Sequence, residues 1–425
     1  MHNDSATAFL IICSAMVLFM TPGLAFFYGG LVRASSVVSM MMMSFGSIAL
    51  IGTLWVVFGY AISFGAAGSG NFVGIDGIFG LDLNKLFVDD VYRQALSGDS
   101  LGLVVAGFQG TFAIITVALI SGAVADRARF GSWMLFAGLW GTVVYFPIAG
   151  WVFNFTVKDG KVVDGGWLVY NVGLLDFAGG TVVEVASGAS ALALALVVGK
   201  RFGFAKGMHA PHNVPLTLIG AGILWFGWLG FNAGSELAAD GIAALAFVNT
   251  MAAPVGGLLA WALYEKFVVG KPTAVGAASG AVSGLVAITP SCAYLTPLWA
   301  LALGAIAGLL CAFAVELKWK LGFDDSLDVV GIHLVGGIIG TLFIGLVGNG
   351  VGLLQTGSFD QLGKQAIGVA AIGLYAFASA FAIAWLIQKT IGFRVTSTDE
   401  IAGVDRVLHG EEAYSESDPR WTWKP

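Results

Sequence analysis

The sequence predicts an all-α, polytopic membrane protein with eleven transmembrane helices, ten of which form an inverted five-plus-five, pseudo-two-fold repeat. Three observations lead to this prediction. The 425 residues are 57% hydrophobic and only 11% charged, with a mean hydropathy of +0.87, whereas soluble proteins carry about 25% charged residues. Apolar runs of about 20 residues, long enough to span a bilayer, recur along the whole chain. Similar motifs also recur five segments apart. The composition excludes a soluble globular domain.

The predicted helices follow from apolar runs that are separated by short polar or Gly-rich stretches. An odd number of spans places the two termini on opposite sides of the membrane. The eleven segments lie at residues 7–32, 37–64, 101–124, 131–155, 176–199, 213–235, 241–264, 273–289, 294–317, 327–348 and 365–391.

Lysine and arginine set the predicted orientation, because cytoplasmic loops carry an excess of both residues. All but five of the 20 basic residues fall on the side of the odd-numbered loops and the C-terminus. We therefore expect the N-terminus outside, the C-terminus inside, and a multi-pass protein of the cytoplasmic membrane. The five exceptions are Lys85, Arg93, Lys158, Lys161 and Lys364.

The predicted organisation is a transmembrane domain, 1–392, followed by a cytoplasmic tail, 393–425. The repeats cover approximately 7–199 and 213–348, and the helix at 365–391 is additional. The tail is charged and has no spanning capacity. It is interpreted as a docking element or a linker stub, and the alternative is a loosely ordered terminus.

Two pairs of similar motifs are the evidence for the predicted repeat. "FFYGGLV" in the first helix resembles "GFNAGSE" in the sixth, and "DFAGGTVVE" in the fifth resembles "DVVGIHLVGG" in the tenth. An offset of five helices inverts the topology, and inverted repeats are typical of transporters whose site lies at the repeat interface near the membrane midplane.

Glu184 and His333 are ionisable residues inside predicted spans, in the fifth and tenth helices. Burying an ionised carboxylate at mid-membrane is costly, so such residues indicate function and a partner. Their equivalent places in the two repeats predict a Glu184–His333 pair, in which the carboxylate accepts the imidazole N–H and fixes its tautomer. The alternative is two independent polar residues, each satisfied by neighbouring backbone or hydroxyl groups.

Asp176 and Asp328 stand where the same two helices are predicted to begin. An acidic side chain there caps free N–H groups and complements the helix dipole, so we interpret both as structural.

Aromatic residues and one hydroxyl suggest a cation route. Phe108 and Phe112 are four residues apart on the third helix, and Trp228, Phe231 and Ser235 follow one another along the sixth. Aromatic faces attract cations, although most aromatic residues in spanning helices only pack or form the interfacial belt. Cysteine and histidine spacings predict no metal and no cofactor, and no basic stripe indicates nucleic acid.

Several stretches together resemble the ammonium transporter (Amt/Mep/Rh) family, on its bacterial Amt side. They run in order from the first predicted helix to the tail, so the resemblance covers essentially the whole chain. The stretches are "FFYGGLVR", "FQGTFAIITVALISGAVADRARF", "DFAGGTVVE", "HNVPL", "GWLGFNAGSE", "AALAFVNT", "SGLVAITPSCAY", "DVVGIHLVGGIIGTLFIG" and "HGEEAY".

The resemblance implies a homotrimer with one narrow hydrophobic pore per subunit. It implies that Ser235 recruits ammonium at an outer vestibule beside Phe108, and that Phe112 and Phe231 form a stacked gate beneath. Tyr28 and Trp228 would line the pore. His333 would be the second histidine of a twin-histidine pair, and Asp176 would hold the outer site's architecture.

Two positions depart from the family pattern. Glu184 stands where the first of the twin histidines is expected. The tryptophan that roofs the recruitment site is replaced by Phe153, a weaker cation–π partner. Trp151 keeps the aromatic residue two positions earlier, so recruitment is assigned to Ser235, Phe108, Phe153 and Trp151.

The predicted function is ammonium or ammonia transport, with capture at the vestibule, deprotonation, and passage through the pore with a Glu184–His333 proton relay. Methylammonium as a further substrate is left open. The alternative is an ammonium sensor with little transport, coupled to a signalling module through the C-terminus. We expect no enzymatic activity. By family analogy the tail and cytoplasmic loops suggest a PII-type regulator or a fused signalling domain as partner.

Overall fold

The computed structural model describes residues 4–65, 70–204, 207 and 210–414. This part is mostly helical, and ten of its helical stretches are long and apolar enough to cross a membrane. They are α1 (Asp4–Leu31); α2 (Val37–Leu54) with η1 (Ala34–Ser36), η2 (Trp55–Gly59) and α3 (Tyr60–Ser63); α5 (Leu101–Ile120) with η5 (Ser121–Val124); α6 (Phe130–Trp140) with η6 (Gly141–Tyr145) and α7 (Phe146–Phe153); η8 (Gly180–Val185) with α8 (Ala186–Val198); α9 (Val214–Gly234); α10 (Gly241–Val268); α12 (Pro297–Leu321); η10 (Val330–Leu334) with α13 (Val335–Val347); and α15 (Asp360–Thr390).

The predicted segment at 273–289 is present as α11 (Ala274–Ile288), a shorter apolar helix. Its 15 residues rise about 22 Å, less than the hydrocarbon thickness of about 30 Å. It is therefore apolar but shorter than the ten long stretches, which is why the described residues hold ten long candidate spans where the sequence predicts eleven.

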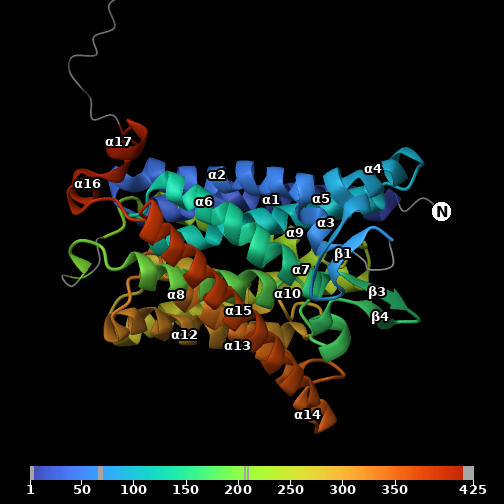
Figure 1. The fold of residues 1–425 in the computed structure, drawn as a ribbon. Helices are drawn as coiled ribbons and strands as arrows, with labels where there is room; N and C mark the ends of the chain where they lie inside the picture. Colours follow the sequence, from blue (N-terminus) through green and yellow to red (C-terminus); the bar gives the residue numbers. More distant parts are fainter. Residues whose placement is uncertain (1–3, 66–69, 205–206, 208–209, 415–425) are drawn as a thin grey trace, which may run out of the picture.

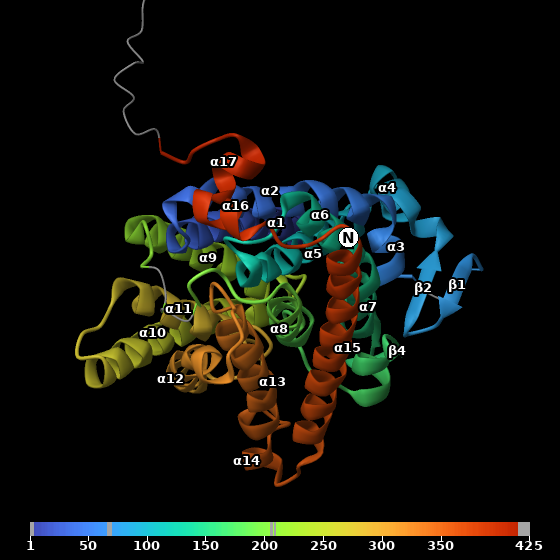
Figure 2. The same cartoon turned by 60° about the vertical axis from the view of Figure 1, so that its left-hand side comes forward.

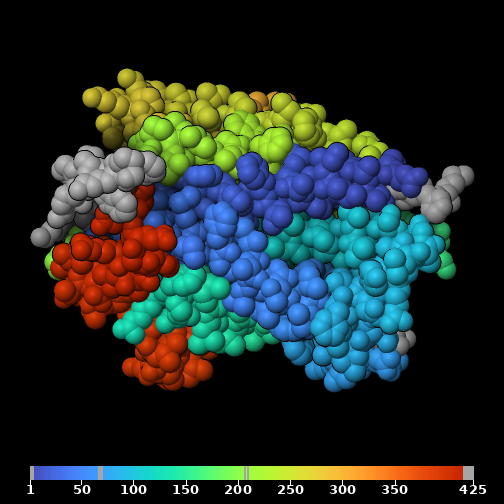
Figure 3. All heavy atoms as spheres, turned by 90° about the horizontal axis from the view of Figure 1, so that it is seen from above, coloured from blue at the N-terminus to red at the C-terminus, as the bar shows by residue number. Residues whose placement is uncertain are grey.

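Glycine lets the helices approach closely. α1 and α9 run side by side, as the dark-blue and lime-green atoms in Figure 3 show. A Cβ on Gly220 of α9 would collide with the backbone of Phe27, and one on Gly23 of α1 would lie 2.6 Å from Ile223 Cγ2. On α12, a Cβ on Gly304 would strike the Ala253 carbonyl of α10. Small residues at such crossings are typical of helix packing in membranes.

Two antiparallel hairpins mark one end of the bundle (Figure 1). The first pairs β1 (Phe72–Ile75) with β2 (Phe79–Asp82) in the register Phe72↔Asp82, and the second pairs β3 (Phe155–Lys158) with β4 (Lys161–Gly165). We call this the hairpin end. The shorter helices η4 (Leu83–Val88), α4 (Asp89–Leu96), η7 (Leu168–Val172) and α14 (Leu353–Thr356) complete the connections.

The opposite end, the tail end, carries α16 (Ser397–Ala402) and α17 (Val404–His409) (Figures 1 and 2). Asp405 accepts hydrogen bonds from the N–H groups of Val38 and Ser39 at the start of α2. Arg33 donates to the Glu400 carbonyl at 2.8 Å. The described part of the tail is therefore packed against the bundle, and its last stretch, "ESDPRWTWKP" (416–425), lies outside the described residues.

Candidate functional site

The centre of the site is formed by two short stretches of wider helical turn. Glu184 lies on η8 and His333 on η10, and both stretches are π-helical. Such turns occur frequently at functional sites. Glycine also lets α13, which continues η10, approach η8, since a Cβ on Gly337 would lie 2.8 Å from the Gly180 carbonyl and 2.9 Å from Glu184 Cβ.

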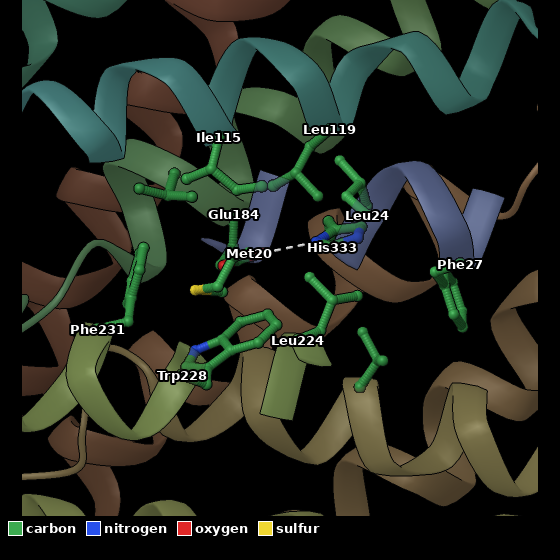
Figure 4. A pocket seen from close by; sticks show the side chains of 12 residues that line it. Met20, Leu24, Phe27, Ile115, Leu119, Glu184, Leu224, Trp228, Phe231 and His333 are labelled. Atoms are coloured by element: carbon green, nitrogen blue, oxygen red, sulfur yellow. Dashed lines mark hydrogen bonds and ion pairs between the residues drawn. The ribbon is translucent and has the colours of Figure 1, made fainter. Parts of the chain in front are cut away.

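Glu184 and His333 meet in the bundle core. Nδ1 of His333 lies 2.6 Å from Oε2 of Glu184, as the dashed line in Figure 4 marks. The residues are 0% and 4% exposed, and Oε1 of Glu184 has no hydrogen-bond partner. A carboxylate that accepts the Nδ1 proton leaves Nε2 as the second ring nitrogen. The contact joins the two residues that the sequence pairs across its repeats.

A narrow cavity surrounds this pair. Its volume of ≈ 10 Å³ is about that of one water-sized sphere. Its lining is apolar except for the Glu184–His333 pair and the indole of Trp228, whose Nε1 donates to Thr289 Oγ1 at 2.8 Å. The lining residues are Met20, Leu24, Phe27, Ile115, Leu119, Val183, Glu184, Leu224, Trp228, Phe231, Val282 and His333 (Figure 4).

Stacked phenylalanines lie beside the cavity. The rings of Phe112 and Phe231 are parallel to within 15°, with centroids 3.9 Å apart, and Phe231 lines the cavity. Phe108 lies 4.8 Å from Phe112 and Phe153 meets Phe112 edge-on at 6.3 Å. Ser235 donates its hydroxyl proton to the Phe231 carbonyl at 2.8 Å. Four aromatic rings and the hydroxyl thus come together at the hairpin end of α5 and α9.

Trp151 does not join this cluster. Its Nε1 donates to the Ile78 carbonyl, and its ring packs on Trp167 at 5.6 Å and on Tyr375 at 5.0 Å. The structure thus places Trp151 beside Trp167 and Tyr375 rather than against these rings, and its part in recruitment stays a prediction. Its indole N–H is used to anchor the turn between β1 and β2, whereas Phe153, two residues later, faces Phe112.

Tyr28 lies beside the cavity rather than in its lining. Its hydroxyl donates to the Leu119 carbonyl at 3.0 Å, and the preceding Phe27 is the residue that lines the cavity. The tyrosine is 1% exposed. The predicted place of Tyr28 in the lining of the pore stays a prediction.

Asp176 holds the start of η8. Its carboxylate accepts from the N–H groups of Gly179, Gly180 and Thr181, and from the Thr181 hydroxyl. The residue is 8% exposed. Three of these four bonds satisfy backbone N–H groups that a helix start leaves free, so Asp176 stabilises the turn that carries Glu184.

Asp328 does not cap the tenth predicted helix, which corrects the second capping assignment. Its Oδ1 pairs with Lys318 Nζ, and the residue takes a left-handed φ of 64°. Asp325 caps instead, through Oδ2 and the Val330 N–H at 2.7 Å. The signal was present in the sequence: Asp325 precedes His333 by eight residues, the same spacing as Asp176 and Glu184.

Metal ligation finds no support in the side chains that the structure describes. Within these residues no group of three or more His, Cys, Asp or Glu could hold a metal ion. Cys13, Cys292 and Cys311 are buried and unpaired in disulfides. The chemistry available at the centre is proton transfer and hydrogen bonding by one carboxyl and one imidazole.

The fold and the site define a class of protein: a multi-pass helical membrane protein with a narrow cavity that aliphatic and aromatic side chains line. The chain belongs to the ammonium transporter family, because the model described as Ammonium Transporter Family matches residues 8–414. This is a family of transporters rather than enzymes.

The similarity to known proteins extends over almost the whole length of this chain. A Mycobacterium tuberculosis (strain ATCC 25618 / H37Rv) protein named "Ammonium transporter" is 48% identical over 432 residues, which covers 96% of this chain and 90% of the relative. The crystal structure of Saccharomyces cerevisiae Mep2 is 31% identical, with a TM-score of 0.82 over 98% of this chain and 93% of Mep2. A structure named "Sensor Amt Protein" is 27% identical, with a TM-score of 0.86 over 96% of this chain and 99% of that chain.

Proposed function

We propose that this protein transports ammonium across the cytoplasmic membrane by capturing the cation at the hairpin end, deprotonating it, and passing ammonia and the proton inward separately. The observation that carries the proposal is the contact between Glu184 and His333 at a narrow, mostly apolar cavity that Phe231 of the stacked pair lines. A cavity of this kind disfavours a bare cation strongly, whereas neutral ammonia passes it at much lower cost.

The proposed topology has eleven transmembrane helices in an inverted five-plus-five repeat, with α11 as the eighth. Two correspondences support it. Asp176 and Asp325 each cap a π turn and each precede an ionisable residue by eight positions. The hairpin end would face outward and the tail end the cytoplasm, as the distribution of lysine and arginine predicts.

Capture would occur where Ser235 and the aromatic cluster meet. Phe108 and Phe153 would offer ring faces to the cation, and Phe112 with Phe231 would be the gate that opens to admit it. Phe231 links the two layers, because it accepts the Ser235 hydroxyl bond at its carbonyl and lines the cavity with its ring. Trp228 lines the same cavity one turn further along α9.

The proton released at the gate would be handled by the Glu184–His333 pair. Ammonium gives up one proton and becomes ammonia, and Oε1 of Glu184 is a buried acceptor without a partner. Its other oxygen already contacts Nδ1 of His333. The transfer uses the tautomer whose ring proton is on Nε2: the protonated carboxyl gives its proton to Nδ1, and the Nε2 proton leaves. In this scheme Glu184 replaces a histidine as acceptor and as the group that orients His333.

Assembly and regulation belong to the same proposal. We place the transmembrane domain at 1–392 and the tail at 393–425, in a homotrimer of independent pores. The tail and the loops it contacts would offer a surface to a PII-type regulator or a fused signalling domain. The sensor alternative is less well supported, because curated relatives at 38–48% identity are named ammonium transporters.

Transport can be tested by uptake into intact bacterial cells that lack their own ammonium carriers. We expect expression of this chain to restore growth on millimolar or lower ammonium and to support saturable uptake. Cells that express the protein in their membrane yet show no uptake above the empty-vector control would contradict transport and favour the sensor.

A further inference from the structure

Glu236 is a carboxylate that the transport scheme above does not use. It follows Ser235 directly at the hairpin end of α9 and is half-buried. The chain turns sharply there, because the N–H of Leu237 donates to the Gly234 carbonyl at 2.9 Å and Leu237 takes a φ of 60°. A Cβ on Gly234 would lie 2.9 Å from the Phe108 ring, so the turn lies against the aromatic cluster.

The groups around Glu236 are acidic or neutral. Asp240 shares a hydrogen bond with it, and Oδ1 of Asp240 caps α10 by accepting from Ile242 and Ala243. From the segment after α11, Cys292 and Tyr294 lie close enough to sense its charge. Among the described residues, no ion pair involves either Glu236 or Asp240.

We propose that Glu236 is an affinity-determining residue for transport, whose carboxylate concentrates ammonium above the phenylalanine gate. The inference rests on the proposed function. Glu236 acts through its field on a cation held by Ser235 and the rings, and it supplies attraction that Phe153 provides only weakly. A unit charge at about 4 Å in a water-like medium raises the local concentration of a monovalent cation about fivefold.

The same geometry makes capture depend on pH. Burial, the charge of Asp240 and the hydrogen bond to Asp240 raise the pKa of Glu236 to about 7. Below that pH Glu236 is protonated and neutral, and above it Glu236 carries a negative charge. Ammonium stays cationic throughout. The apparent KM for ammonium is therefore lowest at alkaline pH and increases as the pH falls through about 7.

The test compares uptake kinetics in intact cells, where only the outer face meets the medium, at several pH values between about 5.5 and 8. For the wild type we expect the apparent KM to rise about fivefold from the alkaline to the acidic end. Glu236→Gln should show the higher KM at every pH, with an unchanged maximal rate. Asp240→Asn keeps the helix cap and removes the neighbouring charge, so its transition should move to lower pH.

Asp159→Asn, in the exposed turn between β3 and β4, removes another acidic charge from the hairpin end and should behave as wild type. A Glu236→Gln protein that transports with the wild-type KM at every pH would overturn the inference and leave the proposed function standing. An Asp240→Asn transition at the wild-type pH would overturn it as well. Absence of uptake by the wild type would instead contradict the proposed function itself.

Discussion

At the scale of single residues, the most unusual feature is the carboxylate of Glu184, which is costly to bury inside a membrane. Glu184 is fully buried, and its compensation is one contact of 2.6 Å to His333. Intramembrane ionisable residues are rare enough to indicate function from sequence alone. The pairing of Glu184 with His333 was predictable because two pairs of similar motifs are separated by the same offset of five helices.

Other residues were less predictable, for physical reasons. Trp151 and Phe153 are only two positions apart, and which ring faces Phe112 depends on the hydrogen bond that Trp151 makes to a distant turn. Asp325 and Asp328 both stand near a helix start. The left-handed φ of Asp328 and the buried Lys318 beside it decide that Asp325 is the cap.

The cap itself gives a residue-scale prediction. Asp325→Ala leaves the buried Val330 N–H without an acceptor, which should cost about 1–3 kcal/mol of stability. Asp325→Asn keeps an acceptor oxygen and should lose much less. Thermal unfolding in detergent, followed by tryptophan fluorescence, measures both. Equal melting temperatures for the two variants would show that the Val330 hydrogen bond contributes nothing to stability.

At the scale of helices, the hydropathy of the sequence predicted that the spanning helices exist and approximately where each begins and ends, because a span must be long and apolar. The pattern could not distinguish α-helical from π-helical turns. Nothing in the residues of η8 and η10 marks the wider turn, and glycines lie at the crossings where these segments meet α13 and α8: Gly337 of α13 approaches Gly180 of η8, and Gly188 of α8 approaches Leu334 of η10. It is this local geometry that brings Glu184 and His333 together.

An element-scale prediction follows from the same crossing. Gly337→Leu would place a side chain where Gly180 and Glu184 already lie within 3 Å of the missing Cβ, forcing η8 away from α13. We expect at least tenfold slower ammonium uptake and a lower melting temperature. Gly222→Leu on α9, where a Cβ would meet nothing within 4 Å, is the matched control. Comparable uptake by the two variants would contradict the importance of this approach.

At the scale of the whole molecule, the two ends differ in the residues that they carry. The hairpin end holds Ser235, Glu236 and the aromatic cluster, whereas the tail end is joined by charged residues. Arg201 contacts Asp324 at 2.9 Å and Asp126 at 3.2 Å, and buried Arg127 donates to the Asp324 carbonyl. These links connect loops that are far apart in sequence, so no local pattern could predict them. Only the excess of basic residues on that side was visible beforehand.

Proton transfer by the Glu184–His333 pair is tested most directly by the ammonium-evoked current in proteoliposomes on a solid-supported membrane. We predict a selective current for the wild type. Glu184→Gln and His333→Ala should each reduce this current at least tenfold. The glutamine retains the shape and one acceptor oxygen but cannot take up a proton as a carboxylate does. Wild-type ammonium-selective currents in both variants would contradict the relay.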